Sequence, residues 1–95
     1  MAGLAFDGSI TTGHSSAPPT RLISTQDIVY VEGKAVLVEG DEIVKHSYTD
    51  DPPHGGVVIS SNAVVHIGGK RVAQIGDRIS CGDTISEGSS IVVVR

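Results

Sequence analysis

Short runs of β-branched apolar residues, separated by glycine-containing turns, are the main pattern along the chain. No stretch shows the sustained 3.6-residue periodicity of an amphipathic helix. Two pairs of runs predict hairpins: residues 28–31 and 34–38 flank the turn Glu32-Gly33, and residues 64–67 and 70–75 flank Gly68-Gly69. Glycine in such turns supplies the positive φ that tight hairpins need. The pattern therefore predicts an all-β fold.

The two predicted hairpins are copies of one another. Residues 26–34 align without a gap with residues 62–70, and the alignment continues until Gly40-Asp41 meets Gly76-Asp77. A third, partial copy aligns residues 54–65 with residues 81–92. Because equivalent segments bury equivalent faces, such repetition predicts pseudo-symmetry. We expect three repeats: a first with an insertion within residues 14–23, a middle one without an insertion, and a short final one ending at Arg95.

Length and composition predict a single small domain, residues 1–95, that needs a staple. A chain of this size buries only about 60% of its unfolded surface. Aromatic residues make up 3% of the sequence and tryptophan is absent, so the core is marginal. The single cysteine, Cys81, excludes an internal disulfide. A metal or a partner is left as the source of additional stability.

Charge and hydropathy exclude several classes of protein. The formal net charge is −4, and the charges are dispersed, whereas binding to nucleic acid needs clustered lysine and arginine. Residues 1–6 lack the basic flank and apolar run of a signal peptide. No apolar run approaches the roughly 20 residues of a membrane helix. We therefore expect a soluble chain, and any export must use a route without a signal peptide.

The residues that could bind a metal gather at repeat starts and in connections. One thiol and four imidazoles are available, and a Cys-His₃ set would satisfy the tetrahedral preference of zinc. His54 and Cys81 occupy equivalent repeat positions, and His14 and His46 lie in connections. His66 lies in the middle of a predicted strand, so we assign it to the wall of the fold. The predicted metal ligands are His14, His46, His54 and Cys81.

At this point the sequence resembles the PAAR-repeat family. The family pattern has a His-Gly-Gly start, a Gly-Lys turn, a Pro-Ala-Ala-Arg stretch, then Gly-Asp and a cysteine. In this chain His54-Gly55-Gly56, Gly69-Lys70, Gly76-Asp77 and Cys81-Gly82 follow that order. The tetrapeptide is eroded to Arg71-Val72-Ala73-Gln74, which keeps only the second alanine.

The resemblance implies a small cone of three pseudo-threefold-related β repeats with a metal, usually zinc, near its apex. The same ligands also accept iron. It implies a structural tip, not an enzyme, that caps the trimeric β-helical spike of a contractile injection machine, either a type VI secretion system or a phage tail. The partner would be a VgrG-like or phage central spike protein, with one copy of the tip per trimer. It also implies synthesis in the bacterial cytoplasm without a signal peptide, assembly on the spike tip, transient contact with the target membrane and delivery to the target cell, without an independent homo-oligomer.

The hairpin lysines and the single cysteine raise two other possible functions, a carrier domain and a Cys/His enzyme. A hairpin lysine carries the cofactor in acyl- and biotin-carrier domains, and Lys34 and Lys70 both follow hairpin turns. The usual sequence context of a carrier lysine is missing, so the carrier remains the alternative. A Cys/His enzyme would need an oriented nucleophile and base, for which one cysteine is weak support. For the docking face of a tip, the apolar runs 57–59 and 91–94 are the candidates, unless they pack wholly inside the domain.

Overall fold

The computed structural model describes residues 2–14, 17–47, 52–60 and 63–94. Within them, ten short strands pair antiparallel in five two-stranded units, and there is no helix. The all-β prediction is confirmed. The strands are β1 (Ala2–Gly3), β2 (Leu22–Ile23), β3 (Tyr30–Val31), β4 (Lys34–Ala35), β5 (Glu42–Ile43), β6 (Val58–Ser60), β7 (His66–Ile67), β8 (Lys70–Arg71), β9 (Arg78–Ile79) and β10 (Val93–Val94).

Both predicted hairpins are present, as β3–β4 and β7–β8, although their regular pairing is only two residues long. A third hairpin-like pair joins the two ends of the chain, because β1 pairs antiparallel with β10. The registers of the three pairs are equivalent: Tyr30 faces Ala35, His66 faces Arg71, and Val93 faces Gly3. Tyr30, His66 and Val93 therefore occupy equivalent positions in the three repeats.

The three repeats meet in a closed ring of backbone hydrogen bonds. The Ala5 N–H donates to the Ala73 carbonyl (3.0 Å), Ala73 to Leu37 (2.8 Å), and Leu37 back to Ala5 (3.1 Å). All three residues are fully buried, so they mark the pseudo-threefold axis. Ala73, the alanine kept from the family tetrapeptide, therefore lies at the centre of the fold. The predicted pseudo-symmetry of three repeats is confirmed.

In each repeat the chain runs away from its hairpin pair, turns, and comes back beside the stretch it has just formed. We call the first stretch the outgoing segment and the second the returning segment. The first hydrogen bond of the returning segment is equivalent in all three: Gly8 to Leu22, Gly40 to Val58, and Gly76 to Ile85. The connection between the two segments is longest in the second repeat and shortest in the third. The prediction that the first repeat carries the insertion is thus wrong. The alignment missed it because these connections are polar and irregular, and they carry no strand pattern.

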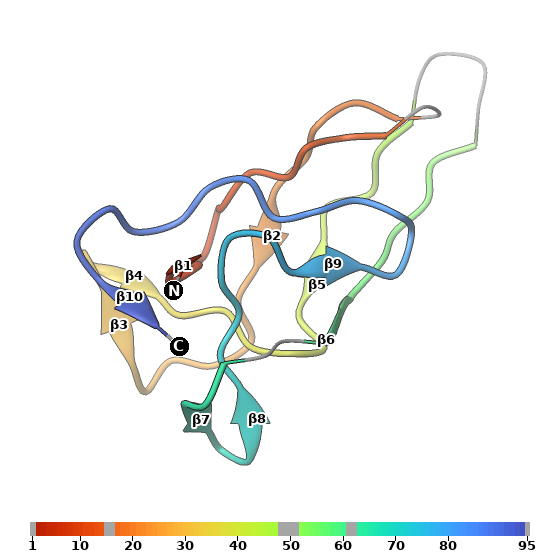
Figure 1. The fold of residues 1–95 in the computed structure, drawn as a ribbon. Coiled ribbons are helices and arrows are strands. Elements are labelled where there is room, and N and C mark those ends of the chain that lie inside the picture. Colours follow the sequence, from red (N-terminus) through yellow and green to blue (C-terminus); the bar gives the residue numbers. More distant parts are fainter. Residues whose placement is uncertain (1, 15–16, 48–51, 61–62, 95) are drawn as a thin grey trace.

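The hydrophobic core runs along the axis in layers of equivalent residues. Leu22, Val58 and Ile85 are at most 2% exposed and pack around the axis beside the ring at Leu37. The molecule is elongated, with extents of 39 × 23 × 21 Å. Figure 1 shows the three hairpin pairs and both termini towards one end, which we call the base. The connections between outgoing and returning segments lie towards the other end, which we call the apex.

Candidate metal centre

The four predicted ligands come together at the apex. One nitrogen from each of His14, His46 and His54 and the Cys81 sulfur all lie within 4.8 Å of one another. The His14 Nε2 lies 3.2 Å from the His46 Nε2 and 3.0 Å from the His54 Nε2. The Cys81 Sγ lies 3.8 Å from the His46 Nε2. His46 is buried, and the other three side chains are half-buried.

The repeat symmetry explains why residues so distant in sequence meet. His14 and His46 occupy equivalent places on outgoing segments, where each exchanges backbone hydrogen bonds with the returning segment: His14 with Ala17, and His46 with His54. Cys81 lies in the short turn of the third repeat, which the Gly82 N–H closes by donating to the Ile79 carbonyl (3.0 Å). All three repeats therefore contribute to one cluster.

Two glycines leave room for this approach. A Cβ on Gly56 would lie 3.2 Å from the Cys81 sulfur and 2.8 Å from a methyl carbon of Ile79. Gly13, next to His14, has φ +75°, and a Cβ there would lie 2.7 Å from the Pro19 nitrogen. Larger residues would push the connections apart. The second glycine of the His-Gly-Gly start thus has a steric cause in this chain.

One ligand has its tautomer fixed by the fold. The His46 Nδ1 lies 2.6 Å from the Pro18 carbonyl oxygen, which can only accept, so Nδ1 carries the proton and donates it. The Nε2 that faces the cluster is then the unprotonated nitrogen, as metal ligation requires. No sequence pattern indicates the role of Pro18, because its backbone carbonyl acts there and not its side chain.

The distances among these donor atoms suit tetrahedral coordination of one cation. Zinc bonds of about 2.0–2.1 Å to nitrogen and about 2.3 Å to sulfur place tetrahedral ligands about 3.4 Å (N to N) and about 3.6 Å (N to S) apart. The separations of 3.0, 3.2 and 3.8 Å lie close to these values. The His14 Nε2 also faces two other Nε2 atoms, and one ring proton cannot serve both. A central cation would satisfy all of these nitrogens together.

His66 is not part of this cluster. It lies in β7 near the base, its side chain is exposed, and its Nδ1 donates to the Val64 carbonyl (3.1 Å). Its assignment to the wall is confirmed.

The base carries a second feature, a set of exposed apolar residues that repeats three times. Ile28, Val64 and Ile91 are 77%, 69% and 75% exposed at equivalent positions. The residues that follow them, Val29, Val65 and Val92, are 40–45% exposed. The backbone carbonyl of each accepts a hydrogen bond from a backbone N–H of an outgoing segment. We call these six residues the base ring.

Only part of the base ring lies in the runs that the sequence suggested for a docking face. Residues 91–93 are exposed at the base, as one candidate run predicted. In the other candidate run, residues 57–59, Val58 is 2% exposed and packs in the core, whereas Ile59 is 52% exposed; this run lies at β6, which pairs with β9 and not with the three hairpin pairs. The equivalents of residue 91 are Ile28 and Val64. The alignment of the repeats makes these three positions equivalent, whereas apolar composition alone does not relate them.

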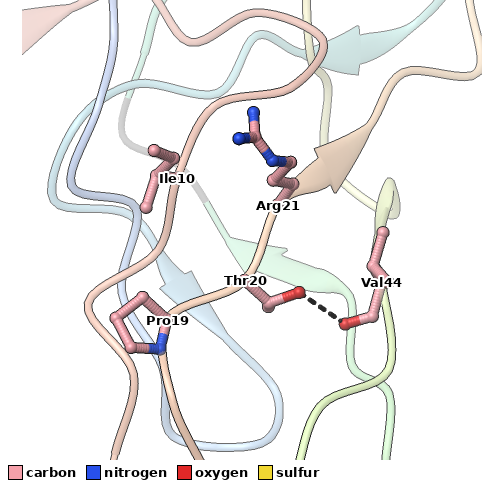
Figure 2. Close-up of a pocket in the computed structure, with 5 residues that line it drawn as sticks. All are labelled: Ile10, Pro19, Thr20, Arg21 and Val44. Atoms are coloured by element: carbon pink, nitrogen blue, oxygen red, sulfur yellow. Dashed lines mark hydrogen bonds between the residues drawn. The ribbon is translucent and has the colours of Figure 1, made fainter.

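A pocket lies between residues of the first and the second repeat (Figure 2). It is lined by Ile10, Pro19, Thr20, Arg21 and Val44. The Thr20 hydroxyl donates to the Val44 carbonyl (2.9 Å), which ties the first repeat to the second. The lining contains no nucleophile paired with a base, so the pocket gives no support to an enzymatic reading. In the described part of the chain, no helix has the length and apolar character needed to cross a membrane.

The fold and the cluster define a class: a small all-β protein of three repeats with a His₃Cys group at one end. The family model described as PAAR motif matches residues 12–87, most of the chain. The chain therefore belongs to the PAAR-motif family. This membership supports a PAAR-type spike-tip role in contractile injection systems. No curated protein sequence matches the chain.

Proposed function

We propose that this chain is the metal-bound tip that caps and sharpens a trimeric β-helical spike, with one copy per trimer, and so aids penetration of the target envelope. One observation carries the proposal: a single chain presents an apolar base with pseudo-threefold symmetry, opposite a cluster of four metal-ligand atoms. A monomer with three equivalent faces fits the end of a partner with three identical chains.

The base ring supports the docking step. Isolated exposed apolar residues are ordinary, but a repeated apolar set on one end of a small domain is typical of an interaction surface. Equal residues at equivalent places offer each spike chain the same contact. The hairpins also end here, and a β-helical partner could continue them with its own strands.

The cluster supports the stabilising step. The apex consists of connections with little apolar packing behind them, so its shape needs another source of stability. Structural zinc contributes its binding free energy to folding, on the order of ten kcal/mol where the site forms only on folding. Four protein donors close a tetrahedral shell and leave no position for an activated water. Zinc is the metal that we propose for this site, with iron as the alternative.

The lysine of the carrier alternative has a structural explanation. The Lys34 ammonium lies 4.5 Å from the centroid of the Phe6 ring, at cation–π distance. Phe6 is 8% exposed, so the Lys34 side chain covers the edge of the core. Its place after a hairpin turn therefore needs no covalent cofactor.

Stoichiometry tests the proposal. The tip is co-expressed with its cognate spike trimer, and the purified complex is weighed by native mass spectrometry. We expect one copy of the tip per trimer, bound at the blunt end in electron micrographs. Three copies per trimer, or no complex, would contradict the use of the pseudo-threefold base as a single cap.

A further inference from the structure

Asp83 is a buried carboxylate that lies two positions after Cys81 in the sequence and is not one of the four candidate ligands. It is fully buried. Its Oδ1 accepts a hydrogen bond from the Thr12 hydroxyl (2.9 Å), and its Oδ2 has no hydrogen-bonding partner among the described residues. Neither atom therefore has a positively charged partner in these contacts. Burying an ionised carboxylate with so little compensation is costly.

The fold itself does not require a carboxylate at this place. The equivalent hydrogen bonds in the three repeats run from Thr11 to the Thr20 carbonyl, from Ile43 to the Gly56 carbonyl, and from Ile79 to the Asp83 carbonyl. The two other repeats thus carry a threonine and a glycine where the third carries an aspartate. The third repeat is also the one that contributes Cys81. The carboxylate of Asp83 therefore points to a role that only the third repeat has.

The contacts of Asp83 join two of the segments that carry candidate ligands, those of His14 and Cys81. Thr12 lies two positions before His14, and Asp83 lies two positions after Cys81. Besides its hydroxyl bond to Asp83, Thr12 donates its N–H to the Thr84 carbonyl (2.9 Å), and its hydroxyl oxygen accepts from the Thr84 N–H (3.3 Å). This small network fixes the turn of the third repeat against the outgoing segment of the first.

We propose that Asp83 is the counter-charge and positioning residue of the metal centre. A divalent cation held by three neutral imidazoles and one thiolate keeps a net charge of about +1, which a buried carboxylate two positions after Cys81 would balance. The same side chain holds the Cys81 turn in place through Thr12. Carboxylates that support metal ligands from outside the coordination shell commonly have this effect on affinity. The inference rests on the proposed metal centre.

Metal affinity of matched variants tests the inference. Asp83→Asn removes the charge and keeps an oxygen that can accept from Thr12. Asp83→Thr places the residue of the first repeat there, which that repeat shows to be compatible with the fold. Asp27→Asn removes the same charge from an exposed position and serves as the control. Zn²⁺ and Co²⁺ dissociation constants are measured by competition with a chromogenic chelator, with the visible spectrum of the Co²⁺ form as a second readout.

We expect both Asp83 variants to bind metal about 10-fold or more weakly than the unmodified chain. We expect Asp27→Asn to bind as the unmodified chain does, and the Co²⁺ spectrum of Asp83→Asn to keep its tetrahedral, thiolate-bound form. Equal affinity of Asp83→Asn and the unmodified chain would overturn the inference, as would an equal loss in Asp27→Asn. If the unmodified chain itself binds no metal, the metal centre is wrong, which is a separate result.

Discussion

Removing the outermost residues of the base ring tests how the tip is held on its spike. The variant Ile28→Ala/Val64→Ala/Ile91→Ala truncates one equivalent residue in each repeat. These side chains are 77%, 69% and 75% exposed in the free chain, so about three quarters of their surface is open to a partner. They contribute little to folding for the same reason. The variant should therefore fold normally and dock poorly.

The size of the loss follows from the exposed surface. Full burial of a valine or isoleucine side chain stabilises by about 1.5–3 kcal/mol, so burying three quarters of it contributes roughly 1–2 kcal/mol. Alanine keeps a part of that contribution, which leaves about 1–1.5 kcal/mol lost per residue. Three residues then lose roughly 3–5 kcal/mol. At 1.4 kcal/mol per factor of ten, the affinity for the trimer falls by about 10²–10³-fold.

The assay is biolayer interferometry with the cognate spike trimer immobilised and the tip in solution. The matched control is Ile23→Ala/Val44→Ala/Ile59→Ala, which truncates residues that are 50%, 46% and 52% exposed on the side of the body. We expect the control to bind as the unmodified chain does. A loss of less than 10-fold in the base variant, or an equal loss in the control, would refute the assignment of the docking face.

Three further results are expected. Cys81→Ser should lose most of its zinc and the thiolate charge-transfer band of the Co²⁺ form, whereas His66→Gln should keep both; a normal band in Cys81→Ser would remove the sulfur from the site. Chelation of the metal by EDTA should lower the thermal midpoint of unfolding by tens of degrees, because metal binding contributes to folding; an unchanged midpoint would argue against a structural ion. Leu37→Ala should cost about 2–5 kcal/mol in the urea unfolding free energy, since Leu37 fills the axis between two alanines, and a loss below 1 kcal/mol would show that the ring at the axis does not support the fold.

Much of the fold could be predicted because turn chemistry is local. Glu32-Gly33 and Gly68-Gly69 fix two hairpins, and the alignment of their flanks reveals the repeats. The pairing of β1 with β10 could not be predicted in the same way. Ala2-Gly3 has no strand pattern of its own, and its partner lies at the other end of the sequence. Only the symmetry of the whole fold requires that pairing.

The four side chains that meet at the apex could be named from the sequence, but the groups that surround them could not. Nitrogen and sulfur donors at equivalent repeat positions indicated His54 and Cys81, and the fold brings His14 and His46 to them. The proton on the His46 Nδ1 depends on the Pro18 carbonyl, which no side-chain pattern reveals. The burial of Asp83 depends on how two repeats pack.

The most direct test of the account concerns the ion that the three repeats are proposed to share. Purified protein is analysed for metal by mass spectrometry and, in the same sample, by X-ray absorption at the edge of the metal found. We expect one equivalent of zinc or iron, with a first shell of three nitrogens and one sulfur at the distances typical of a tetrahedral site. Protein that is folded without a stoichiometric metal, or a shell without sulfur, would contradict the account.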